Sequence, residues 1–166
     1  MILQSGRVSL RPSRPEDSET ILAILQEPGV FKWWGTYDLE KVRSEFEDAA
    51  EVLVIELAGT VVGAIQYWED NEPMYRRAAV DIFLTTSRHG QGLGAEAIRM
   101  LARYLFDERG HHRLTIDPAV SNEAAIRAYE RVGFRPVGVM RQYERGPDGA
   151  WRDGLLMDML RDDFND

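Results

Sequence analysis

The chain contains no cysteine, and this absence removes several kinds of chemistry at once. Disulfides, thiolate nucleophiles and cysteine-ligated zinc are all excluded. No apolar run approaches the ~20 residues of a membrane-spanning helix, and the start, MILQSGRVSLRP, lacks the basic-then-apolar order of a signal peptide. Basic residues are too few for a nucleic-acid-binding surface, because 28 acidic residues against 20 basic ones give a net charge of −8. We therefore expect a cytoplasmic protein that binds neither membranes nor nucleic acid, and whose charge suits a cationic partner.

What remains is the composition of a globular protein. The 166 residues are enough to bury a hydrophobic core, since 44% of them are hydrophobic and 29% are charged. No internal repeat, low-complexity segment or linker interrupts the sequence. We therefore expect one domain that spans residues 1–166.

The stretch from Ala78 to Ala102 changes its hydrophobic period in the middle. Residues 78–84 alternate as a strand does, and the residues after Gly94 repeat their apolar side chains at helical spacing. Alternating glycines lie between the two, in Gly90–Gly94. Glycines let a backbone approach phosphate oxygens closely, and the first amides of a helix have no internal partner. The order strand, glycine loop and helix therefore predicts a pyrophosphate site.

Two other stretches combine aromatic and polar side chains. Trp33 and Trp34 follow a Pro-Gly pair, in a segment that we expect to be a loop. One tryptophan would anchor the loop and the other cover it, or both would line a substrate pocket, where aromatic faces suit sugar rings and cations. Tyr67 and Glu69 lead into an acidic loop, which is either solvated surface or the rim of a site for a polycation.

Single polar residues stand out at three further places. Asp81 interrupts an apolar strand, where an unpaired charge is costly, so it is either held structurally or serves as a base or amine anchor. Asp117 follows the next predicted strand, residues 113–116, and ligands collect at such carboxyl ends. Ser121 is expected to cap the following helix. Tyr129 lies two turns after Asn122 on the same helix face, as a core tyrosine or a functional one.

Two motifs carry a family resemblance. The first is the run His89 to Gly94, HGQGLG, and the second is Ser121 to Phe134, SNEAAIRAYERVGF. At this separation they resemble the GNAT superfamily of acyl-CoA-dependent N-acetyltransferases, and the resemblance covers nearly the whole chain. Trp33-Trp34-Gly35, Asp81 and the segment Thr115 to Asn122 further resemble aminoglycoside 6′-N-acetyltransferases. One departure is His89, where the superfamily usually has arginine or glutamine.

The resemblance implies an α/β (α+β) fold. It has a mixed, mostly antiparallel sheet of six to seven strands, flanked by about four helices. The central strand and residues 113–116 would run parallel and splay apart, with the coenzyme entering between them. A helical crossover also favours a parallel pair, because it is the usual connection between parallel neighbours.

The resemblance also implies an activity and its residues. Acetyl-CoA would donate an acetyl group, without a metal, to a primary amine of a small cationic acceptor, in the first place the 6′-amine of an aminoglycoside antibiotic, which gives resistance. Asp81 would be the base, Asp117 would orient the acceptor or share that role, and Tyr129 would protonate the leaving thiolate. The implied coenzyme site consists of Ile82, Phe83, Leu84, His89, Gly90, Gln91, Gly92, Leu93, Gly94, Ala95, Asn122, Ala125 and Tyr129. The candidate acceptor site consists of Trp33, Trp34, Tyr67, Glu69, Asp81, Asp117 and Asp153.

Several alternatives stay open at this point. A carboxylate of pKa ~4 is a poor base at neutral pH, so the acids are also expected to hold ammonium groups. The acceptor amine could belong to a siderophore hydroxylysine, a polyamine or a protein N-terminus. The spacing Gly90-x-Gly92-x-x-Ala95 also fits a dinucleotide-binding oxidoreductase, although too little chain follows for a substrate domain. A coenzyme A-binding module without catalysis is a third possibility, and both a monomer and a homodimer are compatible with the sequence.

Overall fold

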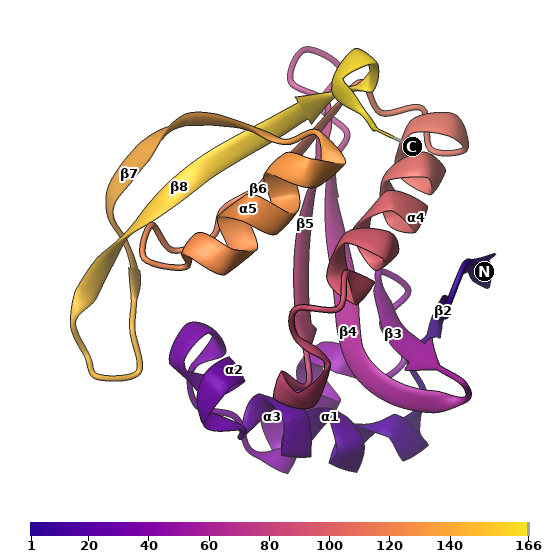
Figure 1. Ribbon diagram of the computed structural model, residues 1–166, viewed down its shortest axis with the longest axis vertical. Helices are drawn as coiled ribbons and strands as arrows, with labels where there is room; N and C mark the ends of the chain where they lie inside the picture. The colour runs from indigo at the N-terminus through magenta and orange to yellow at the C-terminus, as the bar shows by residue number, and fades with distance from the viewer. Residues whose placement is uncertain (166) are drawn as a thin grey trace.

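One mixed β-sheet forms the centre of the protein, and α-helices cover both of its faces (Figure 1). The computed structural model describes residues 1–165. The strands follow the order β1-β2-β3-β4-β5-β6-β8-β7 across the sheet. In chain order they are β1 (Leu3–Ser5), β2 (Val8–Pro12), β3 (Val52–Leu57), β4 (Thr60–Asp70), β5 (Arg77–Leu84), β6 (Arg113–Ile116), β7 (Arg135–Arg145) and β8 (Trp151–Leu160). The α-helices are α1 (Ser18–Leu25), α2 (Pro28–Trp34), α3 (Leu39–Phe46), α4 (Leu93–Asp107) and α5 (Glu123–Val132).

The sheet is antiparallel except between β5 and β6. These two strands pair only at Ala78 with Leu114 and at Ala79 with Thr115. The rest of β5, residues 80–84, has β4 on one side and no paired strand on the other. α4 connects β5 to β6 as the helical crossover expected between parallel neighbours. The prediction of a mixed sheet with a splayed parallel pair is therefore confirmed.

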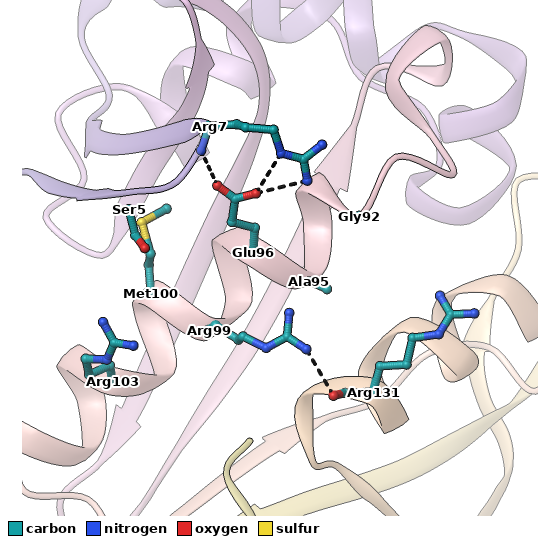
Figure 2. Close-up of a pocket in the computed structure, with 9 residues that line it drawn as sticks. All are labelled: Ser5, Arg7, Gly92, Ala95, Glu96, Arg99, Met100, Arg103 and Arg131. Carbon is teal, nitrogen blue, oxygen red and sulfur yellow. Dashed lines mark hydrogen bonds and ion pairs between the residues drawn. The ribbon is translucent and has the colours of Figure 1, made fainter. Parts of the chain in front are cut away.

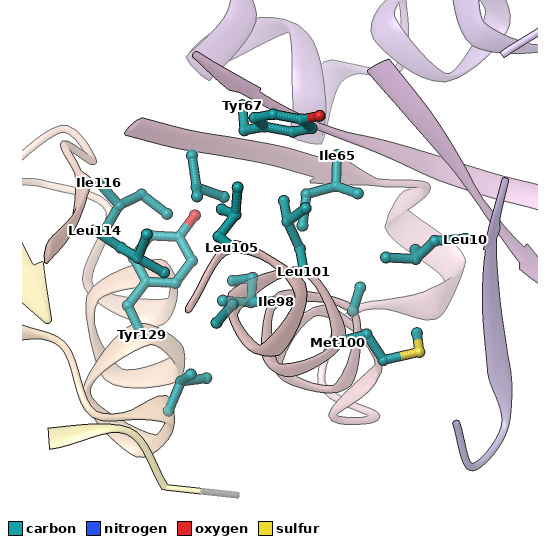
Figure 3. Close-up of a cluster of buried hydrophobic side chains, with 14 of the residues drawn as sticks. Leu10, Ile65, Tyr67, Ile98, Met100, Leu101, Leu105, Leu114, Ile116 and Tyr129 are labelled. Carbon is teal, nitrogen blue, oxygen red and sulfur yellow. The ribbon is translucent and has the colours of Figure 1, made fainter. Parts of the chain in front are cut away.

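The two faces of the sheet carry separate hydrophobic cores. α4 and α5 cover the larger core, part of which is shown in Figure 3. α1, α2 and α3 cover the smaller core on the opposite face. β5 contributes to both cores, because its side chains alternate between the faces: Val80 joins the larger core and Phe83 the smaller one. Asp81, two residues before Phe83, belongs to the face that α1 to α3 cover.

Strands and helices are more numerous than the resemblance implied. Residues 1–165 hold eight strands and five α-helices, instead of six or seven strands and about four helices. The additional strand is β1, a short edge strand paired with β2. The additional helix is α2, where the sequence predicted a loop. Its first residue is Pro28, and proline suits the first helical turn because its missing N–H would have had no helical partner there.

The start of α5 also differs from the prediction. Its N-cap is Asn122 and not Ser121. The Oδ1 atom of Asn122 accepts a hydrogen bond from the Ala125 N–H at 3.4 Å, which satisfies one of the free amides of the first turn. The helix ends at Val132, and Gly133 is its C-cap.

Candidate active site

The loop between β5 and α4 presents free backbone amides. Gly90 and Gly92 have φ angles of 73° and 79°, in the left-handed region that glycine adopts without strain. Gly92 is the N-cap of α4, and the first hydrogen bond of this helix runs from the Glu96 N–H to the Gly92 carbonyl at 3.1 Å. The N–H groups just before Glu96 therefore have no partner within the helix, and loop residues 86–92 are exposed. Together with the helix dipole, they form a site for an anion.

A groove of about 370 Å³ continues from Gly92 along the outer side of α4 (Figure 2). It lies between the β1–β2 turn and the end of α5. Arg7 Nη2 pairs with Glu96 Oε2 at 3.0 Å, and Arg99 Nη2 donates to the Arg131 carbonyl at 3.1 Å. The lining residues are Ser5, Arg7, Gly92, Ala95, Glu96, Arg99, Met100, Arg103 and Arg131. Arginines outnumber the single glutamate, which makes the groove suitable for phosphate groups.

Asp81 lies on the part of β5 that has no strand on its β6 side. Its Oδ1 accepts a hydrogen bond from the Ile82 N–H at 2.9 Å, and the residue is half-buried. Burial, followed by the negative charges of Asp117 and Glu144, raises the pKa of Asp81 from 3.8 to about 7, against the lowering effect of the Ile82 hydrogen bond. A carboxylate with a pKa near 7 is a far better general base at neutral pH than an ordinary one.

Asp117 and Glu144 complete a cluster of acids with Asp81. Asp117 follows β6, and the Tyr143 hydroxyl donates to its Oδ2 at 3.2 Å. Burial and the charge of Glu144 raise the pKa of Asp117, although the Tyr143 hydrogen bond and Arg77 oppose this shift. Three carboxyl groups, from β5, from the residue after β6 and from β7, thus act on one another electrostatically, and such a cluster suits ammonium groups.

Tyr129 projects from α5 toward the sheet (Figure 3). Only 8% of the residue is exposed, and its ring packs against Phe134 with the centroids 6.3 Å apart. Burial raises the pKa of Tyr129, and the charges of Asp81 and Asp117 raise it further. The phenol therefore remains protonated at neutral pH, within electrostatic reach of both carboxyl groups.

The adjacent tryptophans of α2 have different environments. Trp34 belongs to the smaller core, where its ring packs edge-on against Phe83 with the centroids 4.9 Å apart. Trp33 is half-buried, and its ring lies 5.5 Å from the guanidinium carbon of Arg152 and 5.0 Å from Lys32 Nζ. Trp34 therefore anchors the helix, and Trp33 faces two cationic side chains, Lys32 of α2 itself and Arg152 of β8.

Tyr67 and Glu69 lie away from this cluster. Tyr67 is buried in the larger core, with its ring centroid 6.3 Å from that of Tyr104 on α4. Glu69 Oε2 accepts a hydrogen bond from His111 Nε2 at 2.6 Å. Both residues alternate with Trp68 along β4, so they share the sheet face opposite to Asp81. This placement does not support the expected contact with an acceptor.

Asp153 is engaged within the last hairpin, and three neighbours there were not anticipated. Its Oδ1 accepts the Gln142 N–H at 2.7 Å, at a bulge of β7. Glu144 belongs to the acid cluster, Tyr143 bonds Asp117, and Arg152 bonds the end of α2. No local feature of the sequence marks these three residues as site residues. β8 lies between β6 and β7 in the sheet, and this strand order brings the hairpin beside Asp117.

The remaining coenzyme candidates border β5 and the glycine loop. His89 Nε2 donates to the Leu84 carbonyl at 2.8 Å, so His89 closes the loop onto the end of β5. The side chains of Leu93 and Phe83 are buried in the two cores, which leaves only their backbone atoms for a ligand.

Within residues 1–165, no helix is long and apolar enough to cross a membrane. The same part of the chain holds no group of three or more histidine, aspartate or glutamate side chains arranged to bind a metal ion.

The splayed strand pair, the glycine loop and the acid cluster define an acetyltransferase of the GNAT type. Residues 7–135 match the family described as Acetyltransferase (GNAT) domain, and the chain belongs to this family.

Relatives of known name agree with this assignment. Aminoglycoside N(6′)-acetyltransferase type 1 of Klebsiella pneumoniae is 25% identical over an alignment of 162 positions, and the match covers 86% of this chain and 79% of that protein. The crystal structure of aminoglycoside acetyltransferase AAC(6′)-Ib with coenzyme A and kanamycin superposes with a TM-score of 0.78 at 25% identity, covering 94% of this chain and 96% of that one. Ribosomal-protein-S5-alanine acetyltransferase from Vibrio fischeri shares the fold, with a TM-score of 0.84 at 17% identity over the full length of both chains.

Proposed function

We propose that this protein transfers an acetyl group from acetyl-CoA to a primary amine of a small cationic acceptor, and that its preferred acceptor is the 6′-amine of an aminoglycoside. The observation that carries the proposal is Asp81. This carboxyl group has a pKa near 7, beside the open side of β5 and close to a second acid and a protonated phenol. We further propose that the activity resides in a single domain and in the cytoplasm.

The coenzyme site is supported by two groups of donors. The free amides at the start of α4 suit the pyrophosphate, and the arginines of the groove along α4 suit a further phosphate. Asn122, at the start of α5, carries a side-chain amide that can bond the amide groups of the pantetheine arm. AAC(6′)-Ib, a relative with the same fold, was crystallised with coenzyme A.

The chemistry needs a base, an oxyanion donor and an acid. The acceptor amine arrives as an ammonium ion, and Asp81 takes its proton directly or through a water molecule, so that the nitrogen can form a bond to the acetyl carbonyl carbon. A backbone N–H of residues 82–84 on the open side of β5 stabilises the oxyanion that results. As the carbon–sulfur bond breaks, the Tyr129 hydroxyl gives its proton to the leaving thiolate. The nitrogen loses its second proton as the amide forms, which restores the Tyr129 hydroxyl, and Asp81 releases the first proton to solvent.

Two observations support an aminoglycoside as the acceptor, namely the negative charge of the acid cluster and the names of the relatives. Asp81, Asp117 and Glu144 provide negative charge for additional ammonium groups. The named relatives at 25% identity acetylate aminoglycosides according to their names, and AAC(6′)-Ib was crystallised with kanamycin.

A thiol-release assay with acetyl-CoA tests the proposal. Kanamycin, spermidine, an N-hydroxylysine derivative and a peptide with a free N-terminus are compared as acceptors at equal concentration. We expect the highest kcat/KM with kanamycin, and mass spectrometry should show one added acetyl group. Preference for another amine would refute the aminoglycoside assignment, and no thiol release with any amine would refute the acetyltransferase mechanism at Asp81.

A further inference from the structure

Helix α2 is attached at its start to the coenzyme loop. Glu27 is its N-cap, and the Glu27 side chain reaches the segment just after β5. Glu27 Oε1 accepts the Thr86 N–H at 2.7 Å, and Oε2 accepts the Thr85 hydroxyl at 2.7 Å. A Cβ atom on Gly29 would lie 3.0 Å from Thr86 Oγ1, so the two segments are in close contact. Burial would raise the pKa of Glu27, yet these hydrogen bonds lower it, and the carboxylate is held in its charged form.

The same helix is attached at its end to the last hairpin. Arg152 of β8 donates from Nη1 to the Lys32 carbonyl at 2.6 Å and from Nη2 to the Trp33 carbonyl at 2.7 Å. Its Nε donates to Glu144 Oε1 at 2.9 Å. One guanidinium group therefore joins the last turn of α2 to the strand that carries Glu144, a member of the acid cluster. A cation at a helix C-terminus also interacts favourably with the helix dipole.

We propose that α2 couples the coenzyme site to the acceptor site, with Glu27 and Arg152 as its positioning residues. When the coenzyme restricts the motion of the loop between β5 and α4, Glu27 holds the start of α2 against that loop. Arg152 bonds the end of α2, so the β7–β8 hairpin beside Asp117 becomes less mobile as well. The inference rests on the proposed function, because it takes the two ends of α2 to face the coenzyme and the acceptor.

Short charge-assisted hydrogen bonds at both ends make α2 suitable for this task. The helix has only seven residues, and the contact of Trp34 with Phe83 ties its last turn to β5 as well. Because coupling between two sites is reciprocal, an acceptor that orders the hairpin should also strengthen coenzyme binding.

Amide hydrogen exchange with coenzyme A as the only ligand tests the coupling without an acceptor. In the wild-type protein, coenzyme A should slow exchange in residues 85–95, in residues 28–34 and in residues 141–152. We expect a slowing of at least about fivefold in residues 28–34, the lower end of typical coupling factors. In Glu27→Ala, residues 85–95 should keep their protection while the other two segments lose it. In Arg152→Ala, only the hairpin segment should lose it.

Matched variants separate coupling from general loosening. Glu19→Ala changes an exposed glutamate on α1, and Arg145→Ala changes an arginine of the same hairpin that bonds the Gly149 carbonyl. Both should behave as the wild type does. Should Glu27→Ala fail to fold, Thr85→Val removes the hydroxyl donor from the other side of the same contact.

The outcomes distinguish the coupling from the function on which it rests. Protection of residues 85–95 without protection of residues 28–34 in the wild type would overturn the coupling alone. Protection of residues 28–34 that persists in Glu27→Ala would also overturn it. If coenzyme A protects no part of residues 85–95, the proposed coenzyme site fails, and the coupling fails with it.

Discussion

Asp81 combines two properties that rarely occur together in a strand residue, namely a position among apolar neighbours and a carboxyl group close to other carboxyl groups. Both raise its pKa, which lies at about 7. A base acts only in its deprotonated form, so kcat/KM should rise with pH through a midpoint near 7 and level off above it. The measurement is a pH profile of kcat/KM between pH 5 and 9 with the acceptor that the thiol-release assay selects.

The Asp81→Asn variant is the control for this profile. It keeps the side-chain volume and an oxygen for the Ile82 N–H, but it cannot accept a proton. Turnover should fall by a factor of roughly 100 or more, the usual scale of general-base catalysis, and the midpoint near 7 should disappear. If the same midpoint remains in Asp81→Asn, it belongs to the acceptor amine or to another residue.

The raised pKa of Asp81 also predicts an effect on stability. The unfolded chain releases this proton near pH 3.8, whereas the folded protein keeps it up to about pH 7. The folded state therefore binds the extra proton between these values, and the free energy of unfolding falls as the pH rises through this window. Asp81→Asn removes the effect, so its stability relative to the wild type should rise by roughly 3 kcal/mol between pH 5 and pH 8.

Urea unfolding of both proteins at pH 5, 6.5 and 8 measures this difference. The sign is the informative part, because a catalytic carboxylate held in a costly environment destabilises the protein that carries it. A stability difference that stays constant with pH would show that folding does not change the pKa of Asp81.

At the scale of single elements, the conformation of the glycine loop before α4 predicts the effect of a substitution at Gly92. Gly92 has a φ of 79°, and an alanine there would be strained by about 1 kcal/mol and would place a methyl group at the anion site. Gly59, in the β3–β4 turn, has a φ of 80° with nothing within 4 Å of an added Cβ. Gly59→Ala therefore carries the same backbone strain at a distance from the loop.

Both glycine variants should lose similar stability, but only one should lose the coenzyme. We expect Gly92→Ala to weaken the binding of coenzyme A at least about tenfold, or about 1.4 kcal/mol, while Gly59→Ala binds as the wild type does. Isothermal titration with coenzyme A measures both. Equal affinities would mean that the loop backbone does not approach the phosphates closely.

The elements differ in how far the sequence predicted them. The order β5, glycine loop and α4 was predictable, because the hydrophobic period changes from two to about 3.6 across it. Helix α2 was not predicted, since the pair Pro28-Gly29 favours a loop, although proline is equally suited to begin a helix. The short β1 carries too few residues for a pattern, and only its pairing with β2 defines it.

At the scale of the whole molecule, the acid cluster depends on the strand order. Asp81 and Asp117 were recognised because each has a local signal, a charge in an apolar strand or a position at a strand end. Glu144 and Arg152 have no such signal. Glu144 lies close to the other acids, and Arg152 close to α2, because β8 lies between β6 and β7 in the sheet. This strand order depends on the packing of the complete sheet, so a local sequence pattern does not predict it.

Binding of the coenzyme should raise the free energy of unfolding of the whole protein. Acetyl-CoA binds only where the glycine loop, α4 and α5 are all in place, so a concentration of about 100 times the dissociation constant should stabilise the folded protein by about 2.7 kcal/mol. For a chain of this size, that corresponds to a rise in Tm of about 5–10 °C.

NAD also carries a pyrophosphate, but it lacks the pantetheine arm for which Asn122 and the open side of β5 are suited, so it should leave Tm unchanged at the same concentration. Differential scanning fluorimetry with the two ligands measures this preference, and stabilisation by NAD alone would overturn the assignment of this site to acetyl-CoA.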